Sequence, residues 1–220
     1  MSRSDSSMFL HFGQVTTLIV LVYVDDIIIT DSSSTPISSL IAKLDSVFAL
    51  RDLGQLSFFL GIEVSYNEGS MNLSQTKYIS DLRHRTETFN IKPTKTPSVV
   101  GKNLSKFDGD PMADVTHYQS VVGALQYVTL TRLDIAFAVN KACQFMQQPT
   151  TAHWVSVKRI LQYLRGTMQD GFLLSPSSNL TIKGFTDADW GAHLDDKRNS
   201  SGYLVYLRGN LVFGPLPNKK

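Results

Sequence analysis

Two adjacent carboxylates, Asp25 and Asp26, stand between the apolar runs at residues 18–22 and 27–29. Adjacent carboxylates repel each other, and partial burial raises the cost of keeping both charged. A divalent cation removes this repulsion. Hard oxygen ligands suit Mg²⁺ or Mn²⁺, which bind nucleotide phosphates and assist in-line displacement. The alternative is a solvated turn, where aspartate is common, but apolar runs on both sides favour a metal site.

The flanking residues predict the strands that position this pair. Residues 7–12 and 16–24 are typical of two strands, and residues 27–29 resume the β-branched pattern directly after the two aspartates. The second strand is a near-continuous apolar run, as expected of a strand buried on both faces. Asp25 and Asp26 therefore lie where one strand turns into the next.

Further periodic segments predict a mixed chain. Ser34, Thr35 and Pro36 are typical of a helix start, and a linker of about twenty residues begins at Pro93 and ends at Pro111. The predicted helices are 34–50, 75–89, 115–130, 133–146 and 152–166, and the later strands are 58–66, 70–74, 171–174, 180–186 and 202–207. The order is β-rich, helical and again β-rich, which predicts the α+β class.

Composition excludes several classes of protein. The 220 residues are 42% hydrophobic and 18% charged, which excludes a disordered chain. The single cysteine, Cys143, excludes a disulfide scaffold and a multi-cysteine zinc site. No run of roughly 18 apolar residues predicts a membrane span, and the first residues lack the pattern of a secretory signal. We expect a soluble, intracellular protein, in the cytoplasm or nucleus, with an organelle as the alternative.

The net charge of +2 conceals a segregation of charges. Acidic residues dominate the first thirty or so positions, basic residues dominate 77–106, and residues 135–169 contain no carboxylate. An acidic site flanked by basic stretches suits a polyanion held near a metal. The alternative is that the basic residues form ordinary solvated helix faces.

Several short motifs follow one another along nearly the whole chain. They are YVDDIIIT (23–30), FLGIEV (59–64), LSQTKY (73–78), VGALQY (122–127), KRIL (158–161), YLRGT (163–167) and DADW (187–190). The first resembles the catalytic hairpin of reverse transcriptases. The set, in this order, resembles the Pol polyprotein of copia-type (pseudoviral) LTR retrotransposons, in its reverse transcriptase and ribonuclease H region.

The resemblance implies roles for the polymerase residues. Asp25 and Asp26 correspond to the paired metal-site aspartates of the polymerase palm, with Mg²⁺ or Mn²⁺ as cofactor. Tyr23 and Val24 would lie near the primer terminus and the incoming nucleotide. The implied partners are an RNA/DNA primer-template and dNTPs, and no membrane.

Four later residues are assigned in the same way. Asp187 corresponds to the first metal-binding aspartate of ribonuclease H. Lys158, Arg159 and Arg165 are phosphate contacts by resemblance, although a helix with a solvated basic face explains them equally well. Beside them, His153 and Trp154 suggest either base stacking or core packing, and the apolar stripe of their helix favours core packing.

The resemblance divides the chain into three parts. Residues 1–92 correspond to the C-terminal part of the palm with the start of the thumb, 93–169 to a linker and helical thumb or connection, and 170–220 to the first strands of a ribonuclease H-like domain.

Two departures from the family pattern concern the carboxylates. The family's third palm aspartate would precede Met1, and no glutamate follows Glu87 to complete ribonuclease H. We therefore expect a fragment of an RNA-directed DNA polymerase that is inactive alone. The alternatives are a non-catalytic nucleic-acid-binding remnant and a pseudogene product that does not fold stably.

Overall fold

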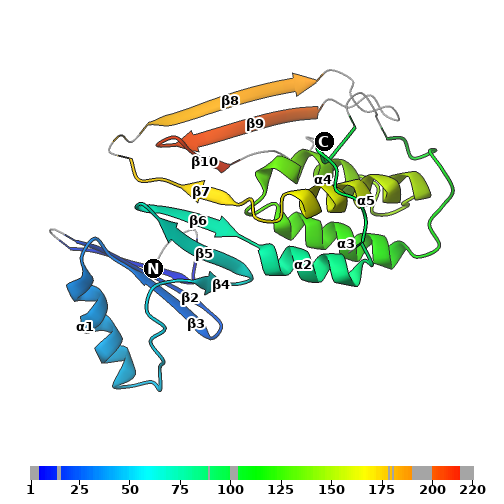
Figure 1. The fold of residues 1–220 in the computed structure, drawn as a ribbon. Coiled ribbons are helices and arrows are strands. Elements are labelled where there is room, and N and C mark those ends of the chain that lie inside the picture. Colours follow the sequence, from blue (N-terminus) through cyan, green and yellow to red (C-terminus); the bar gives the residue numbers. More distant parts are fainter. Residues whose placement is uncertain are drawn as a thin grey trace. The chain divides into compact units, whose positions relative to one another are not determined.

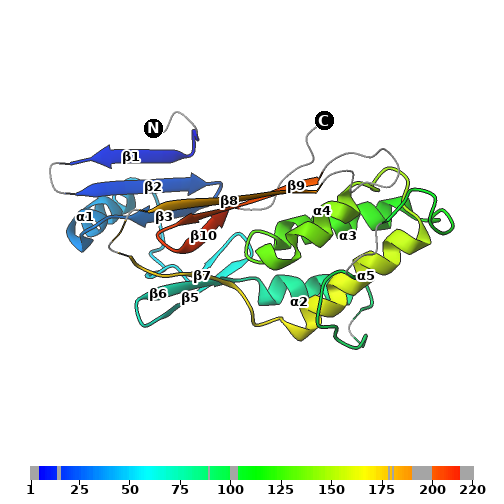
Figure 2. The same ribbon diagram turned by 90° about the horizontal axis from the view of Figure 1, so that it is seen from above.

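The computed structural model describes residues 5–13, 16–88, 90–99, 104–177, 179, 181–189 and 200–213. The chain divides into two compact units, Met1–Phe59 and Leu60–Lys220. Their elements are labelled in Figure 1 and seen from above in Figure 2.

The N-terminal unit is built on an antiparallel sheet. Its strands are β1 (Met8–Phe12), β2 (Thr17–Tyr23) and β3 (Asp26–Thr30), in the spatial order β1-β2-β3. The helix α1 (Ser34–Asp45) and the short strand β4 (Phe58–Phe59) follow. The three predicted strands are confirmed, and consecutive antiparallel pairing makes β2 the central strand.

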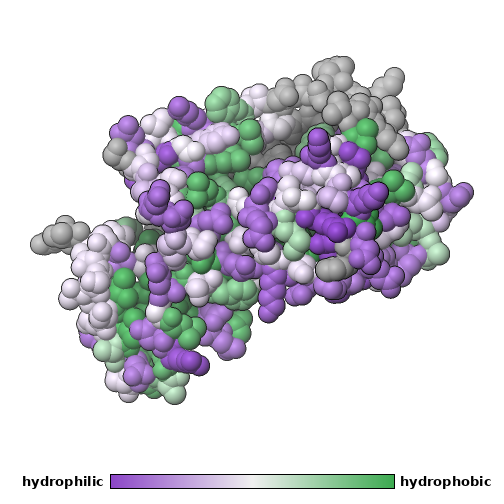
Figure 3. All heavy atoms as spheres, in the orientation of Figure 1, coloured by the Kyte–Doolittle hydropathy of each residue, from purple (hydrophilic) through white to green (hydrophobic). Residues whose placement is uncertain are grey.

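The expectation that β2 is buried on both faces is wrong. Its side chains are exposed or of intermediate exposure, and none of the described residues in 5–59 is buried. A strand is buried on both faces only where layers cover both sides of its sheet. The unit supplies one helix, which itself has no buried residue, and Figure 3 shows apolar residues at the surface of this unit.

The helix α1 is shorter than predicted. It ends at Asp45, whereas the periodicity predicts an end near Leu50. The large apolar residues beyond this end, Val47, Phe48 and Leu50, are exposed. Because they gain no burial, nothing offsets the entropy cost of extending the helix through them.

The C-terminal unit begins with a second antiparallel sheet. The strands β5 (Ile62–Asn67) and β6 (Ser70–Ser74) form the predicted hairpin, and β7 (Phe172–Leu174) pairs with β6 from far along the chain. The predicted strand 58–66 is interrupted at Leu60 and Gly61. Both have positive φ, 48° and 79°, which is turn geometry and not strand geometry.

The helices of this unit are α2 (Thr76–Arg85), α3 (Val115–Val128), α4 (Ala136–Cys143) and α5 (Thr151–Gly166). A 3₁₀ turn, Leu133–Ile135, precedes α4. All four helical regions were predicted, although α2 is shorter than 75–89 and Phe89 lies outside the described residues. The described residues of the predicted linker form no helix, and Pro111 makes an isolated bridge with Thr150.

The core of the molecule lies among these helices. The predicted apolar stripes of α3, α4 and α5 are buried, except for Trp154, which is partly buried against them. The cluster consists of Ile79, Leu82, Tyr118, Val121, Val122, Leu125, Val128, Ile135, Ala138, Val139, Ala142, Val157, Ile160, Leu161 and Leu164. The 3.6-residue period is thus a correct guide to the core in this unit.

A third antiparallel sheet ends the described chain. It contains β8 (Ile182–Asp189), β9 (Ser200–Leu207) and β10 (Asn210–Phe213), in the order β8-β9-β10. β10 was not predicted, because a four-residue strand leaves little periodic signal. Helices and antiparallel sheets together make an α+β architecture. No helix among the described residues is long and apolar enough to cross a bilayer.

Candidate functional site

The Asp25–Asp26 pair lies at the tip of the β2–β3 hairpin. Tyr23 and Asp26 are the last paired residues of the two strands, so Val24 and Asp25 form a two-residue loop. Tyr23, Val24, Asp25 and Asp26 are all exposed. The predicted position of the pair is therefore confirmed, and its carboxylates are accessible to solvent and ligands.

The loop of this hairpin is strained at Val24. Its φ is 49°, a left-handed conformation in which a β-branched residue is an outlier. In the β5–β6 hairpin the matching loop is Glu68-Gly69. Glu68 has a similar φ of 48° but is not β-branched, and the glycine after it adopts positive φ without a steric cost. Strain of this kind clusters at functional sites, and Val24 is also 82% exposed.

An aromatic contact supports the base of the loop. The rings of Tyr23 and Phe59 meet edge to face, with centroids 6.4 Å apart. This arrangement is favoured by the ring quadrupoles. It ties the residue before the loop to β4 of the same unit.

The donor set of the hairpin fits part of a magnesium site. Asp25 and Asp26 supply ionised oxygens, and Mg²⁺ is commonly bound by one or two carboxylates together with water and substrate phosphates. The described residues hold no group of three or more His, Cys, Asp or Glu side chains placed to bind a metal ion. The hairpin thus offers two ligands.

Asp187 belongs to the other unit. Its backbone lies in β8, opposite Gly202 of β9, and its side chain lies outside the described part of the structure. Its predicted role as a metal ligand stays a prediction.

Two of the three predicted phosphate contacts on α5 are hydrogen-bonded to the segment that follows α2. Arg159 donates a hydrogen bond from Nη2 to Oγ1 of Thr96, over 2.9 Å. Arg165 donates from Nη1 to the carbonyl oxygen of Ile91. A guanidinium has five N–H donors, so these bonds leave each arginine further capacity. Lys158 is partly exposed.

His153 packs in the helical core, as the apolar stripe predicted. It is fully buried, and its ring stacks on Phe145 with centroids 3.8 Å apart. The N–H of Thr150 donates to Nδ1 over 3.0 Å, which completes a capping box at the start of α5. Because Nδ1 accepts this bond, Nε2 carries the proton and donates to the carbonyl oxygen of Ser105, 3.0 Å away.

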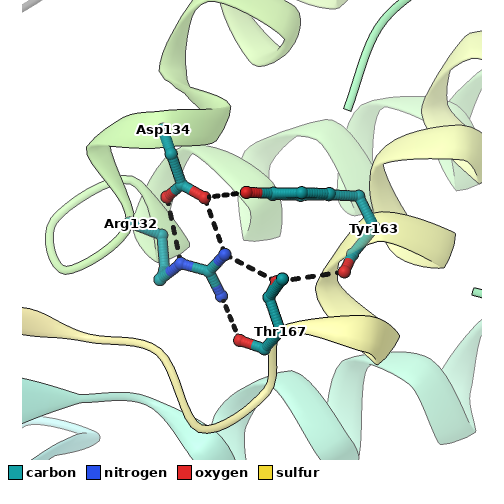
Figure 4. A network of polar contacts seen from close by, with 4 residues as sticks. All are labelled: Arg132, Asp134, Tyr163 and Thr167. Carbon is teal, nitrogen blue, oxygen red and sulfur yellow. Dashed lines mark hydrogen bonds and ion pairs between the residues drawn. The ribbon is translucent and has the colours of Figure 1, made fainter. Parts of the chain in front are cut away.

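A polar network joins α5 to the segment before α4 (Figure 4). Arg132 donates from Nε and Nη2 to the two carboxylate oxygens of Asp134, over 3.0 and 2.7 Å. The same guanidinium donates from Nη1 to the carbonyl oxygen of Thr167 and from Nη2 to its hydroxyl, both over 2.7 Å. Tyr163 donates its hydroxyl to Asp134 over 2.8 Å. A buried guanidinium is thus bound on several sides.

The network determines the charge state of its members. Burial by itself raises the pKa of Asp134, but the hydrogen bonds from Arg132 and Tyr163 and the guanidinium charge hold it below its usual value. The pKa of Tyr163 is raised by burial and by its hydrogen bond to Asp134. Asp134 therefore stays ionised at neutral pH and Tyr163 stays protonated.

Known proteins resemble this chain over most of its length. Residues 1–100 match the family model described as reverse transcriptase (RNA-dependent DNA polymerase). The retrovirus-related Pol polyprotein from transposon RE1 of Arabidopsis thaliana is 40% identical over 94% of this chain, and the one from transposon TNT 1-94 of Nicotiana tabacum is 36% identical over 93%.

The chain belongs to the reverse transcriptase family of copia-type, retrovirus-related Pol polyproteins.

The relatives differ greatly in the share of their own length that this chain covers. The chain spans 14% of the RE1 polyprotein and 16% of the TNT 1-94 polyprotein. It spans 80% of an uncharacterized mitochondrial protein of Arabidopsis thaliana, to which it is 38% identical over 88% of its own length. No solved structure matches the chain.

The reverse transcriptase match includes the Asp25–Asp26 hairpin, the β5–β6 hairpin and α2, so it extends past the boundary between the units. The Arg132 network lies beyond it. Tyr163 and Thr167 belong to the YLRGT motif, whereas Arg132 and Asp134 lie outside the motifs given above, and nothing in the sequence spacing indicates that the four residues meet. The one signal in the sequence is that Arg132 and Asp134 are two residues apart, which allows an ion pair between them.

Proposed function

We propose that this chain contributes the YVDD hairpin of an RNA-directed DNA polymerase. In this proposal Asp25 and Asp26 hold a divalent cation, Mg²⁺ or Mn²⁺, and the substrates are an RNA/DNA primer-template and dNTPs. The observation that carries the proposal is the exposed carboxylate pair at the tip of a strained hairpin, inside the segment that matches the reverse transcriptase family.

Each residue of the hairpin has a distinct task in this proposal. A bound Mg²⁺ supplies positive charge that stabilises the phosphoryl-transfer transition state. Asp25 and Asp26 accept the cation with oxygens that are ionised and solvent-accessible. Tyr23, held by Phe59, and Val24 lie beside the carboxylates, where the primer terminus and the nucleotide would bind.

Two carboxylates make an incomplete site for this chemistry. The described residues provide no third carboxylate, histidine or cysteine to complete a cluster. We propose that a further carboxylate comes from outside the described residues, and that the 220-residue chain by itself does not extend a primer.

Primer extension tests this proposal. The chain is incubated with oligo(dT) annealed to poly(rA), dTTP and Mg²⁺ or Mn²⁺, and we expect no extension above a control without protein. Extension that is abolished by Asp25→Asn would show instead that the chain is a complete polymerase.

Metal binding tests the hairpin separately from activity. Paramagnetic relaxation of water protons reports bound Mn²⁺, and we expect Asp25→Asn and Asp26→Asn each to weaken Mn²⁺ binding. Asp45→Asn is the matched control, because Asp45 is an exposed carboxylate of the same unit. Equal Mn²⁺ affinity of the Asp25 and Asp45 variants would refute the metal site.

The division into palm, helical connection and ribonuclease H-like parts is also a proposal. The antiparallel order β8-β9-β10, with Asp187 in β8, supports the assignment of 170–220 to the first strands of a ribonuclease H-like sheet. If Asp187 is a metal ligand, Asp187→Asn removes one Mn²⁺ site in the same relaxation measurement and leaves the Asp25 site unchanged.

A second candidate function is nucleic-acid binding without catalysis. Arg85, Lys92 and Lys95 lie close together in the sequence, and all three are exposed. Binding through such residues weakens steeply as salt rises, because phosphate contacts release counterions. Fluorescence anisotropy with a labelled primer-template tests this. We expect Lys92→Gln to lower the slope of log K against log salt by about 1.

The matched control for that measurement is Lys43→Gln, since Lys43 is an exposed lysine on α1. A salt slope near zero, or equal slopes for the Lys92 and Lys43 variants, would eliminate this candidate.

A further inference from the structure

The C-terminal unit contains a cavity of about 390 Å³. Its walls come from the segment that follows α2, from α4 and from α5. All of its described lining residues belong to this unit, and it shares no residue with the Asp25–Asp26 hairpin. Its volume falls within the range of small-molecule sites.

Most of the cavity wall is aliphatic. Ile91, Val99 and Leu104 line it from the segment after α2, and Val155 and Ile160 line it from α5. Among the described lining residues there is no aromatic side chain and no carboxylate. An aliphatic wall favours a flexible hydrocarbon body, whereas nucleobases are usually bound by stacking on aromatic rings.

Three cationic side chains share the same wall. Lys141 comes from α4, and Lys158 and Arg159 come from neighbouring positions of α5. The Nζ atom of Lys141 lies over the ring of Phe137, 4.8 Å from the ring centroid. With no acidic group among the described lining residues, the cavity presents positive charge beside apolar surface.

Arg159 has an unused donor in this wall. Its Nη2 is held by Thr96, which fixes the guanidinium. Its Nε is buried and has no hydrogen-bond partner among the described residues. A buried donor without an acceptor is costly, and an anionic ligand oxygen or a water would satisfy it.

We propose that this cavity binds a small amphipathic anion, an aliphatic chain that ends in one carboxylate. The aliphatic wall takes the chain, and Lys158 and Arg159 bind the carboxylate, with Lys141 adding positive charge. This site is independent of the proposed polymerase function.

Calorimetry with three probes of one chain length tests the proposal. The probes are octanoate, 1-octanol and octylammonium, which carry the same hydrocarbon chain with negative, neutral and positive heads. Octanoate binds saturably at one site, and octylammonium binds at least about tenfold more weakly, because one charge-assisted hydrogen bond is worth about a factor of ten.

Variants separate binding of the head group from a structural role. Lys158→Gln and Arg159→Gln each weaken the binding of octanoate by about tenfold and leave the affinity for 1-octanol unchanged. Lys77→Gln is the control, since Lys77 is exposed on α2 and does not line the cavity. The circular dichroism of each variant is compared with that of the unmodified chain, so that a loss of fold is recognised.

Three outcomes overturn the proposal. The first is the absence of saturable octanoate binding to the folded chain, and the second is equal affinity for octanoate and 1-octanol. The third is that dAMP binds saturably, that Lys158→Gln weakens this binding, and that octanoate does not bind. This result would assign the cavity to a nucleotide.

Discussion

The two units of this chain both contain strongly apolar segments but bury them to very different extents. The β2 strand carries five apolar residues in a row, and none is buried. The helices α3 and α5 carry apolar residues at helical spacing, and most of these side chains are completely buried. Hydrophobicity of a segment therefore does not decide its burial, which depends on how many layers the surrounding chain supplies.

The buried core and the Asp25–Asp26 pair therefore lie in different units. Packing among α2, α3, α4 and α5 supplies the core, so the C-terminal unit has its own source of folding free energy. The N-terminal unit carries the exposed Asp25–Asp26 pair on a three-stranded sheet without a buried residue among those described. A small sheet is independently stable only when it has at least three strands with a hydrophobic face, or when it packs against a helix.

A core truncation should show the largest contrast. Leu161 is fully buried in α5, and we expect Leu161→Ala to lower the free energy of unfolding of the C-terminal unit by about 4 kcal/mol. In β2, Leu21→Ala should cost about 1 kcal/mol, because that side chain is only partly buried. Urea unfolding followed by circular dichroism measures both.

Val155→Ala is the control on the same helix, because Val155 is 56% exposed. We expect it to change stability by less than about 0.5 kcal/mol. Equal losses for Leu161→Ala and Leu21→Ala would show that the two units are equally well packed. The absence of a cooperative transition in the unmodified chain would favour the pseudogene alternative.

The Arg132–Asp134 pair should give the next largest effect. The side chain of Arg132 is 1% exposed and that of Asp134 is 40% exposed. Asp134→Asn removes the carboxylate that is hydrogen-bonded to a buried guanidinium. Because Asp134 is itself 40% exposed and solvent screens the pair, we expect a loss of about 2 kcal/mol at pH 7 in urea unfolding. The control Asp81→Asn alters an exposed carboxylate of α2 and should have little effect.

The same pair predicts a dependence on pH. Because the folded-state pKa of Asp134 is below its usual value, ionised Asp134 contributes stability above the unfolded pKa of about 3.9, and this contribution is lost as pH falls through the folded pKa. The unfolding free energies of the unmodified chain and of Asp134→Asn should therefore converge in acid. A constant difference from pH 7 to pH 2 would contradict this.

The smallest effect is expected at the hairpin loop. Val24→Asn replaces a β-branched residue at φ 49° by one that tolerates the left-handed region, so we expect a gain of about 1 kcal/mol in the N-terminal unit. Hydrogen exchange of the β2 and β3 amides measures it. Glu68→Asn, at φ 48° in the β5–β6 turn, is the matched change. It should give a smaller gain in stability, because Glu68 is not β-branched. A loss of protection in Val24→Asn would refute the strain.

The local sequence pattern predicted helices and strands correctly where apolar residues recur at a regular spacing. The helices around Tyr118, Val139 and Leu161 were correctly predicted, as was the hairpin that carries Asp25 and Asp26. The errors occur where signals are short or depend on neighbours. Examples are β10, the end of α1 and the interruption at Leu60 and Gly61.

The sequence by itself determined the family, the α+β class and the position of the two aspartates at a turn, because these depend on residues that are close together in the chain. Only the tertiary structure decided which apolar residues are buried, that β7 joins β6, and that Arg132 meets Thr167. The physical reason is that burial and long-range hydrogen bonds depend on two segments that are far apart in the chain. The residues of one segment do not specify which other segment packs against it.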